Sequence, residues 1–475
     1  MPEFFSFISE ILWGSLMLYL LLAAGIWFAF QSKFVPFRLF GDFYHNLKNS
    51  RAQSGGLTSY QALFLSLAGR MGSGNIAGVA LAILAGGPGA LFWMWVCAFI
   101  GMATCFAEAT LAQLYKERDT HQRFRGGPAW YMARGLGMRW MGVLFSVFLL
   151  VVYGLLFNTI QANAVVHAVR YAWDIPETWT GMLLAGLLLL LISGGLRRIA
   201  RFMQYAVPVV AIAWVAMSIG VGVAHFSQVP GAIIAIIKGA FGWQEAAAGT
   251  MGYTLSQALT SGFQRSMYSN EAGMGSTPNA AAAAASSPPH PAAQGFVQII
   301  GVVIDTFIVC SASALVLLLA NITPTENNFN GIQIMQQSIV ALTGPWGSGY
   351  VAAIIFMFAF NSIAINYVYA QNNLVFLRLN SRRNRWLLRV GIVLMIMVGS
   401  QLRLTMFWYT ADVIMAFMAI TNLTAILLLS PVVNVVASDY LRQRKLGLTP
   451  VFDPKRYPDI ERQLAPGAWD ERSGV

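Results

Sequence analysis

Charged residues are scarce in this chain, at 10% of its 475 residues against about 25% in an average soluble domain. With 57% hydrophobic residues and a mean hydropathy of +0.60, too little polar surface remains for a fold in water, so lipid is the solvent that fits. Only helices and closed barrels span lipid, and the apolar runs are longer than barrel strands of roughly 9–11 residues. The composition therefore predicts an all-α polytopic membrane protein.

Several chemical signatures are also missing. The three cysteines, Cys97, Cys105 and Cys310, lie in apolar runs without C-x-x-C spacing, so we expect buried thiols and no disulfide framework. No H-x-x-x-H, G-x-S-x-G or G-x-x-x-x-G-K-[ST] string occurs. We therefore expect neither an enzyme nor a cofactor, and an ion gradient rather than ATP as the energy source for uphill transport.

Eleven apolar segments are predicted to span the membrane, and together they form one transporter domain, residues 1–475, with no soluble part. Residues 1–10 hold no Lys or Arg, so the first segment is expected to be a true span rather than a cleavable signal. The predicted spans are residues 11–31, 60–86, 89–115, 140–168, 180–195, 200–225, 250–285, 291–320, 347–377, 387–402 and 406–437.

The basic residues indicate an orientation for these spans. Of the 30 Lys and Arg residues, 25 fall in residues 32–59, 116–139, 197–201, 378–389 and 438–475. Eleven crossings put all five segments on one side, and basic loops favour the cytoplasm. The basic pI therefore reflects topology rather than nucleic-acid binding. In the cell inner membrane we expect an external N-terminus and a cytoplasmic tail, residues 438–475.

Two spans share a string in glycine-rich surroundings that weaken a helix. R-x-x-x-x-N-x-A-G occurs at residues 70–78 and, 195 residues later, at residues 265–273. Five spans separate the copies, so they cross in opposite directions, as in transporters built from inverted repeats. Chance similarity between Gly- and Ala-rich strings is the alternative explanation. Glycines clustered at membrane depth are tolerated where backbone lines a cavity.

A break in a membrane helix has its own chemistry. The exposed N–H groups of one half-helix suit an anion such as a carboxylate, and the exposed carbonyls of the other suit a small cation. Gly72, Ser73, Gly74 and Asn75 supply an approachable backbone and two short polar side chains. A zwitterionic amino acid with an alkali cation matches both ends of such a break.

Charges within the predicted spans are costly and often functional. Arg70, Arg265, Glu271 and Asp305 are predicted to be structural or gating charges, and the last two could instead carry a proton. Glu108 lies near the basic loop and is interpreted as a structural, interfacial residue. The role of Asp412 is left open.

The strings RGGPAWYM, SNEAGMGSTPNAAAAA and FMAITNLTAILLLSPVV resemble the alanine or glycine:cation symporter family, and most closely its members from enteric bacteria. The resemblance covers nearly the whole chain. It implies a LeuT-type fold in which an extra helix, 11–31, precedes two inverted repeats, 60–225 and 250–437. It also implies a monomer that takes up alanine, of either hand, or glycine with Na⁺.

The resemblance further implies where substrate and ion bind. Gln161 is expected to meet the substrate amino group beside the break of the second span, and the seventh span is expected to complete the pocket. The implied substrate-binding residues are Gly72, Ser73, Gly74, Asn75, Gln161, Tyr268, Ser269, Asn270 and Gly273. The implied Na⁺ ligands are Ser73, Asn75 and Ser362.

The chain departs from the family pattern at two positions. Many members carry Thr where this chain has Ser73, and Glu where it has Gln371, so any ion or gating role of that Glu is in doubt here. Proton-coupled symport is the alternative within the same class. A passive channel is the alternative from another class, and a membrane-embedded enzyme comes third.

A substitution at the first break tests the predicted site. We expect Asn75→Ala to abolish Na⁺-dependent alanine uptake, because the side chain supplies a polar ligand at the break, while the protein still inserts into the membrane. Labelled-alanine uptake, with the amount of inserted protein as control, measures this. Normal uptake by the variant would contradict the assignment.

Overall fold

The computed structural model describes residues 7–9, 11–48, 50, 56–242, 251–321, 331–402 and 405–469. Within these residues most of the chain is helical, and seven helices are long and apolar enough to cross a membrane. The chain is thus an all-helical, multi-pass membrane protein, as its composition predicts. The seven helices are Phe7–Gln31, Ala90–Leu114, Arg139–Trp173, Gly195–Ala224, Pro291–Ala320, Trp346–Phe376 and Phe407–Leu428.

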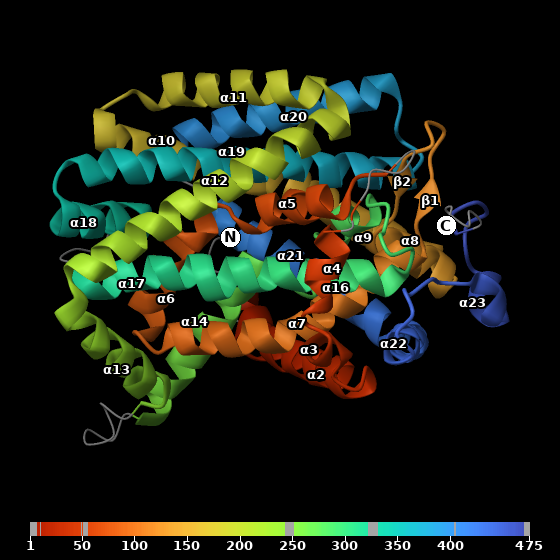
Figure 1. Cartoon of the computed structure of the whole chain (residues 1–475). Coiled ribbons are helices and arrows are strands. Elements are labelled where there is room, and N and C mark those ends of the chain that lie inside the picture. The colour runs from red at the N-terminus through yellow and green to blue at the C-terminus, as the bar shows by residue number, and fades with distance from the viewer. Residues whose placement is uncertain are drawn as a thin grey trace.

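Three of these spans contain a stretch of wider, π-helical winding, which in membrane proteins often marks a functional region. The first is η1 (Leu12–Leu16) followed by α2 (Met17–Gln31). The others are α9 (Arg139–Val151), η4 (Val152–Leu156) and α10 (Phe157–Trp173), and α16 (Pro291–Val302), η7 (Val303–Cys310) and α17 (Ser311–Ala320). The remaining long helices, seen in Figure 1, are α7 (Ala90–Leu114), α12 (Gly195–Ala224), α19 (Trp346–Phe376) and α21 (Thr405–Leu428).

The other predicted spans also coincide with helices, but with interrupted, short or basic ones. Residues 60–86 form α5 (Ser59–Arg70), η2 (Ser73–Asn75) and α6 (Ala77–Gly86). The described part of 250–285 forms α14 (Met251–Asn270) and α15 (Pro278–Ala282). The predicted spans 180–195 and 387–402 coincide with α11 (Glu177–Ser193) and α20 (Arg382–Gln401). Eleven crossings and the LeuT-type repeat remain predictions, because these four segments fall short of a continuous apolar span.

Several elements lie outside the predicted spans. A two-stranded antiparallel hairpin pairs Glu117 with Arg125. Pro431 starts a new helix, so the last predicted span ends at Leu428 rather than at residue 437. The additional elements are α3 (Val35–Arg38), α4 (Asp42–Lys48), β1 (Glu117–Arg118), β2 (Phe124–Arg125), α8 (Pro128–Trp130), η3 (Tyr131–Gly135), η5 (Phe226–Gln228), α13 (Val229–Ala240), α18 (Gly331–Thr343), α22 (Ser430–Lys445), η8 (Pro454–Arg456) and α23 (Pro458–Glu461).

Helix α7 lies at the centre of the packing, against α14 and α16 (Figure 1). Small residues let these helices approach closely, as is usual in membranes. A methyl group on Gly262 of α14 would lie 2.4 Å from the Ala90 carbonyl oxygen. A methyl group on Gly295 of α16 would lie 2.6 Å from the Phe106 ring. These glycines set the distance between the helices that carry the candidate site.

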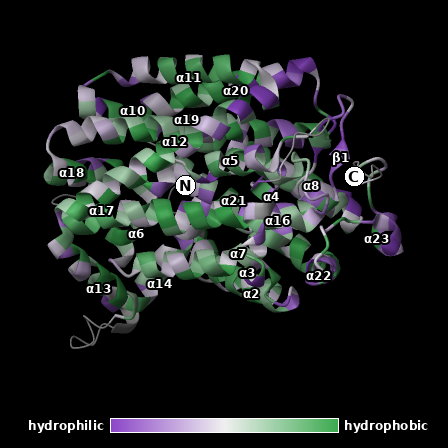
Figure 2. Cartoon of the chain, viewed as in Figure 1, coloured by the Kyte–Doolittle hydropathy of each residue, from purple (hydrophilic) through white to green (hydrophobic). Residues whose placement is uncertain are grey.

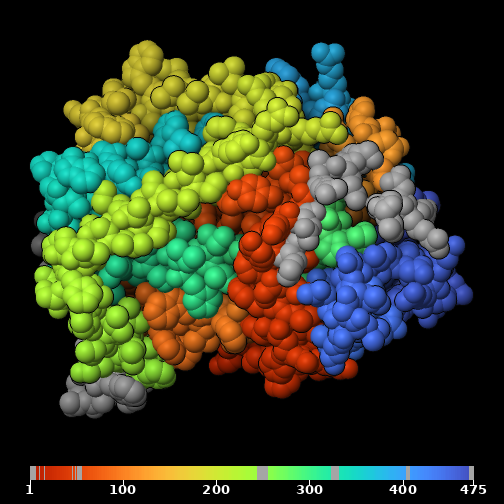
Figure 3. Space-filling view, viewed as in Figure 1, coloured from red at the N-terminus to blue at the C-terminus, as the bar shows by residue number. Residues whose placement is uncertain are grey.

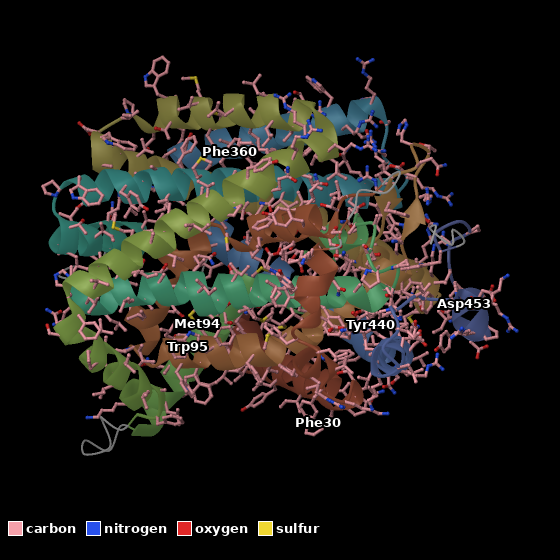
Figure 4. The ribbon with its side chains drawn as sticks, viewed as in Figure 1. Phe30, Met94, Trp95, Phe360, Tyr440 and Asp453 are labelled. Atoms are coloured by element: carbon pink, nitrogen blue, oxygen red, sulfur yellow. The ribbon has the colours of Figure 1, made fainter. Side chains whose placement is uncertain are left out.

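Apolar and polar residues occupy different parts of the surface along the direction of the helices. Phe30, which is 67% exposed, points away from the molecule at its lower edge in Figure 4, as a lipid-facing side chain would. Hydrophilic residues gather at one end, over β1, α22 and α23 (Figure 2), and Asp453 lies at that same end in Figure 4. This end, called the basic end below, carries the hairpin and the C-terminal segment.

The C-terminal segment, residues 430–469, packs against the rest of the basic end. Figure 3 shows it, in blue, beside the N-terminal part of the chain, in red. Arg444 bonds both carboxylate oxygens of Asp42, at 2.7 and 3.0 Å. The Trp469 indole donates to the Leu114 carbonyl oxygen at 3.0 Å, where α7 ends.

Asp439 of α22 anchors this segment to the loop before α16. Its carboxylate lies 3.3 Å from the His290 ring and 2.9 Å from the Gln443 amide. Burial by itself raises the pKa of Asp439, but the hydrogen bonds, that of His290 foremost, lower it to about 2. The carboxylate is therefore charged at neutral pH, and its contribution to docking is lost only as the pH falls toward 2.

Candidate functional site

The first helix break is held open by a glutamine from another helix. Helix α5 ends at Arg70, and Gly72 then takes an extended conformation with φ −111° and ψ −163°. The Ser73 backbone N–H leaves the helical ladder and donates to Gln161 Oε1 of α10 at 3.0 Å. Because an unpaired N–H group at membrane depth is costly, this bond stabilises the break.

The second break is held by buried polar side chains on two other helices. After α14 ends at Asn270, Gly273 has φ +84°, a left-handed conformation that favours glycine. Its N–H donates to Glu108 Oε1 of α7 at 3.2 Å, and its carbonyl accepts from the Asn422 amide of α21 at 2.9 Å. The Asn422 amide also bonds Glu108, at 3.0 Å, so one network fixes the segment.

The two broken helices meet at a cavity of about 420 Å³, which is within the roughly 300–1,000 Å³ range of small-molecule sites. It is lined by glycines of the first break, by charged side chains and by aromatic rings. The lining residues include Gly69, Arg70, Gly72, Ser73, Gly74, Ala77, Gly78, Phe157, Gln161, Arg265, Tyr268, Glu271, Ser362, Trp408 and Asp412.

Gln161 connects three helices across this cavity. Its Oε1 accepts from Ser73, and its Nε2 donates to Ser362 Oγ of α19 at 3.2 Å. A methyl group on Gly72 would lie 2.4 Å from that same Nε2. The amide can therefore hold this position only while residue 72 has no side chain.

A second polar cluster lies behind the first break. The Asn75 amide donates to Asp305 Oδ1 of η7 at 2.5 Å and to Ser269 Oγ at 3.3 Å. The other Asp305 oxygen accepts from Ser269 and, at 3.1 Å, from Thr306. All four side chains are at most 1% exposed, and within the described parts of the chain the Asn75 side-chain oxygen has no hydrogen-bond partner.

The Asp305 carboxylate forms no ion pair with a described residue. Across the part of the chain that the structure describes, no Lys, Arg or His lies within ion-pair distance of it. Arg70 bonds neutral groups instead, among them the Gln298 carbonyl oxygen at 2.9 Å. A buried charge without a partner is strongly disfavoured, so this position calls for a cation or a proton.

The predicted site residues fall into two places. Gly72, Ser73, Gly74, Gln161, Tyr268 and Ser362 line the cavity, together with the charged residues Arg70, Arg265 and Glu271. Asn75 and Ser269 lie in the Asp305 cluster, and Asn270 borders it through a 3.3 Å bond to Thr306. Gly273 contacts Glu108. The three predicted ion ligands thus lie in two places. Ser73 and Ser362 are hydrogen-bonded to Gln161, and Asn75 is hydrogen-bonded to Asp305.

Glu108 is not interfacial, as its place in the sequence had suggested, but fully buried against the second break. Its position inside an apolar run was the signal for a buried role. Asn422, Trp408 and Thr306 were missed altogether, because nothing in their local sequence distinguishes them from helix-packing residues.

Long apolar helices around a cavity with charged and aromatic walls, where two interrupted helices meet, define a multi-pass membrane transporter. The chain belongs to the sodium:alanine symporter family, whose model matches residues 1–454. It is therefore a cation-coupled amino acid symporter, as the family resemblance of its motifs predicted.

Curated relatives match over almost the whole chain. The chain is 61% identical over 474 residues to the uncharacterised transporter YaaJ of Escherichia coli (strain K12), which covers 100% of both proteins. It is 41% identical to the amino-acid carrier protein AlsT of Bacillus subtilis (strain 168), over 95% of each chain. It is 40% identical to the probable sodium/glutamine symporter GlnT of the same organism, over 95% of this chain and 92% of the relative.

Gly72→Ala tests the position of Gln161. The added methyl group displaces the amide and removes two hydrogen bonds, so we expect the KM for the transported amino acid to rise by about tenfold. Gly186→Ala adds the same methyl group on α11, away from the cavity, where it meets nothing within 4 Å, and should leave KM unchanged. Equal effects of both variants in uptake assays would contradict a special role of Gln161.

Proposed function

We propose that this protein is a secondary active symporter that takes up L- or D-alanine or glycine together with Na⁺ by alternating access. The observation that carries the proposal is the Asp305 carboxylate, which is buried against Asn75 of the first helix break and forms no ion pair with any described residue. The description of the family, sodium:alanine symporters, supports both the ion and the substrate.

The charges within the spanning helices support cation coupling. Four carboxylates, from Glu108, Glu271, Asp305 and Asp412, stand against two guanidinium groups, from Arg70 and Arg265. Because uncompensated charge at membrane depth is costly, two negative charges remain to be offset by bound cations or by protons. A coupling ion that enters with substrate meets this requirement.

The Asp305 cluster is the proposed Na⁺ site. Hard cations are bound by oxygen ligands, and this cluster offers the Asp305 carboxylate, the Ser269 and Thr306 hydroxyl oxygens and the unpartnered Asn75 carbonyl oxygen. When Na⁺ enters, the Asn75 amide turns its oxygen toward the ion. Ser73 and Ser362 remain predicted ligands on the cavity side.

The cavity residues fit a small zwitterion. The backbone N–H groups at the start of the half-helix after the first break suit the substrate carboxylate, and Gln161 Oε1, which here accepts from Ser73, suits its ammonium group. Gly72, Gly74 and Ala77 leave room for a small substrate to contact the backbone of the break closely. Because the relative GlnT is named as a probable sodium/glutamine symporter, the length of the substrate side chain is the property to test.

Uptake into proteoliposomes tests the function. With an inward Na⁺ gradient we expect concentrative, saturable uptake of labelled alanine, competed by glycine and D-alanine more strongly than by glutamine. Replacing external Na⁺ by choline at fixed pH should abolish it. Uptake that persists in choline and increases with acidity would assign proton coupling instead, and uptake that never exceeds equilibrium would indicate a passive channel.

Asp305→Asn tests the proposed ion site, because it keeps the shape of the side chain and removes its charge. We expect the Na⁺ concentration for half-maximal uptake to rise roughly ten- to hundredfold, since a bond to a charged group contributes about 1.5–3 kcal/mol. Na⁺ should also raise the melting temperature of the wild-type protein but not that of the variant.

Asp174→Asn is the matched control, because it makes the same change at an exposed loop position. It should leave the Na⁺ dependence unchanged. An Asp305→Asn protein with normal Na⁺ dependence in both assays would show that the ion binds elsewhere.

A further inference from the structure

The first helix, which lies outside the predicted inverted repeats, contacts two walls of the cavity directly. Trp13 of η1 is 4% exposed, and its ring stacks on Tyr268 with centroids 5.3 Å apart and planes at 29°. Its indole N–H donates to the Asp412 backbone carbonyl oxygen of α21 at 3.0 Å. The Ser9 hydroxyl group forms a long hydrogen bond, 3.4 Å, to the Asp412 carboxylate.

The two residues that Trp13 contacts both line the cavity, from different helices. Tyr268 lies on α14 just before the second break, and Asp412 lies on α21. Tyr268 is also near the aromatic rings of Phe157, at 6.4 Å, and Trp408, at 6.5 Å. Trp13 therefore lies behind a ring that faces the substrate space and touches none of that space itself.

Asp412 and Tyr268 each carry a buried polar atom without a partner among the described residues. These atoms are Asp412 Oδ1 and the Tyr268 hydroxyl oxygen. Arg265 lies over the Tyr268 ring at 5.7 Å from its centroid, so the ring also receives a cation on one face. Small displacements of Tyr268 or Asp412 thus change both the polarity and the free volume of the cavity.

We propose that Trp13 is a positioning residue for substrate selection, and that through it the first helix helps to shape the amino acid site. The inference rests on the proposed function of the cavity. By stacking on Tyr268, Trp13 keeps the ring pressed toward the substrate and limits the side chain that fits. By bonding the Asp412 backbone, it fixes the distance between α14 and α21 at the same level.

The structure of the first helix agrees with such a role. Its π-helical stretch, Leu12–Leu16, contains Trp13, and wider winding of this kind rotates the side chains that precede it relative to those that follow. Further along the same helix, Trp27 is 50% exposed and is not among the residues that line the cavity. The helix thus offers one tryptophan at the site and one at the surface.

Three variants separate positioning from folding. In Trp13→Ala the Tyr268 ring loses its support, so the KM for alanine should rise about three- to tenfold, the effect expected for loss of an aromatic pair. Larger neutral amino acids such as leucine should compete at least about threefold better than against wild type. The Na⁺ concentration for half-maximal uptake at saturating alanine should not change.

Trp13→Phe retains a ring that can stack and loses only the N–H, so it should restore most of the KM and the competition profile. Trp27→Ala, the matched control, should behave as wild type. A purely structural role would instead lower the amount of protein and the maximal rate in Trp13→Ala, with KM and leucine competition unchanged, and that result would overturn the proposal. Equal shifts in Trp13→Ala and Trp27→Ala would overturn it as well.

The assay keeps this inference apart from the proposed function. Wild-type protein is first tested with alanine, glycine and glutamine, and the variants are then compared with whichever of these it transports. A wild type that transports only glutamine would refute the proposed substrate and still allow the Trp13 comparison. A wild type that transports alanine while Trp13→Ala keeps its KM and selectivity would refute the positioning role alone.

Discussion

Backbone that leaves a helix at membrane depth must find its hydrogen-bond partners inside the protein, and the rest of this structure depends on that constraint. Two helices are interrupted, after Arg70 and after Asn270. At the first break the partner is the Gln161 amide, and at the second it is Glu108 together with Asn422. Because each partner comes from another long helix, satisfying the breaks also brings the walls of the cavity together.

Electrostatics then divides the space around the breaks into two kinds of environment. In the cavity, two basic and two acidic side chains lie among neutral polar groups and aromatic rings: Arg70, Arg265, Glu271 and Asp412. Behind the first break, Asp305 accepts hydrogen bonds from amide and hydroxyl groups. A zwitterion suits the first environment and a bare cation the second. Asn75 follows directly on the glycines that line the cavity, so one short stretch of backbone connects the two environments.

Sequence reasoning reaches the features that depend on local composition. Lipid-facing helices need long apolar runs, so their places were predictable, and the clustered glycines from residue 69 to 78 predicted an interrupted helix. Contacts between distant residues have no such local signal. Asn75 meets Asp305 across 230 positions, and Glu108 meets Gly273 across 165. Helices α13 and α18 were missed because they are too short to span and resemble connecting segments in composition.

The docking of the C-terminal segment has a consequence for how the molecule is made. Asp42 emerges from the ribosome near the start of synthesis, but its partner Arg444 follows 402 residues later. His290 likewise is synthesised 149 residues before its partner Asp439. Until synthesis is nearly complete, the basic end exposes unpaired charges and an uncovered apolar surface that Phe452 and Trp469 later bury. A chain released early would therefore carry a recognisable defect there, which gives cellular quality control a means to tell finished molecules from truncated ones.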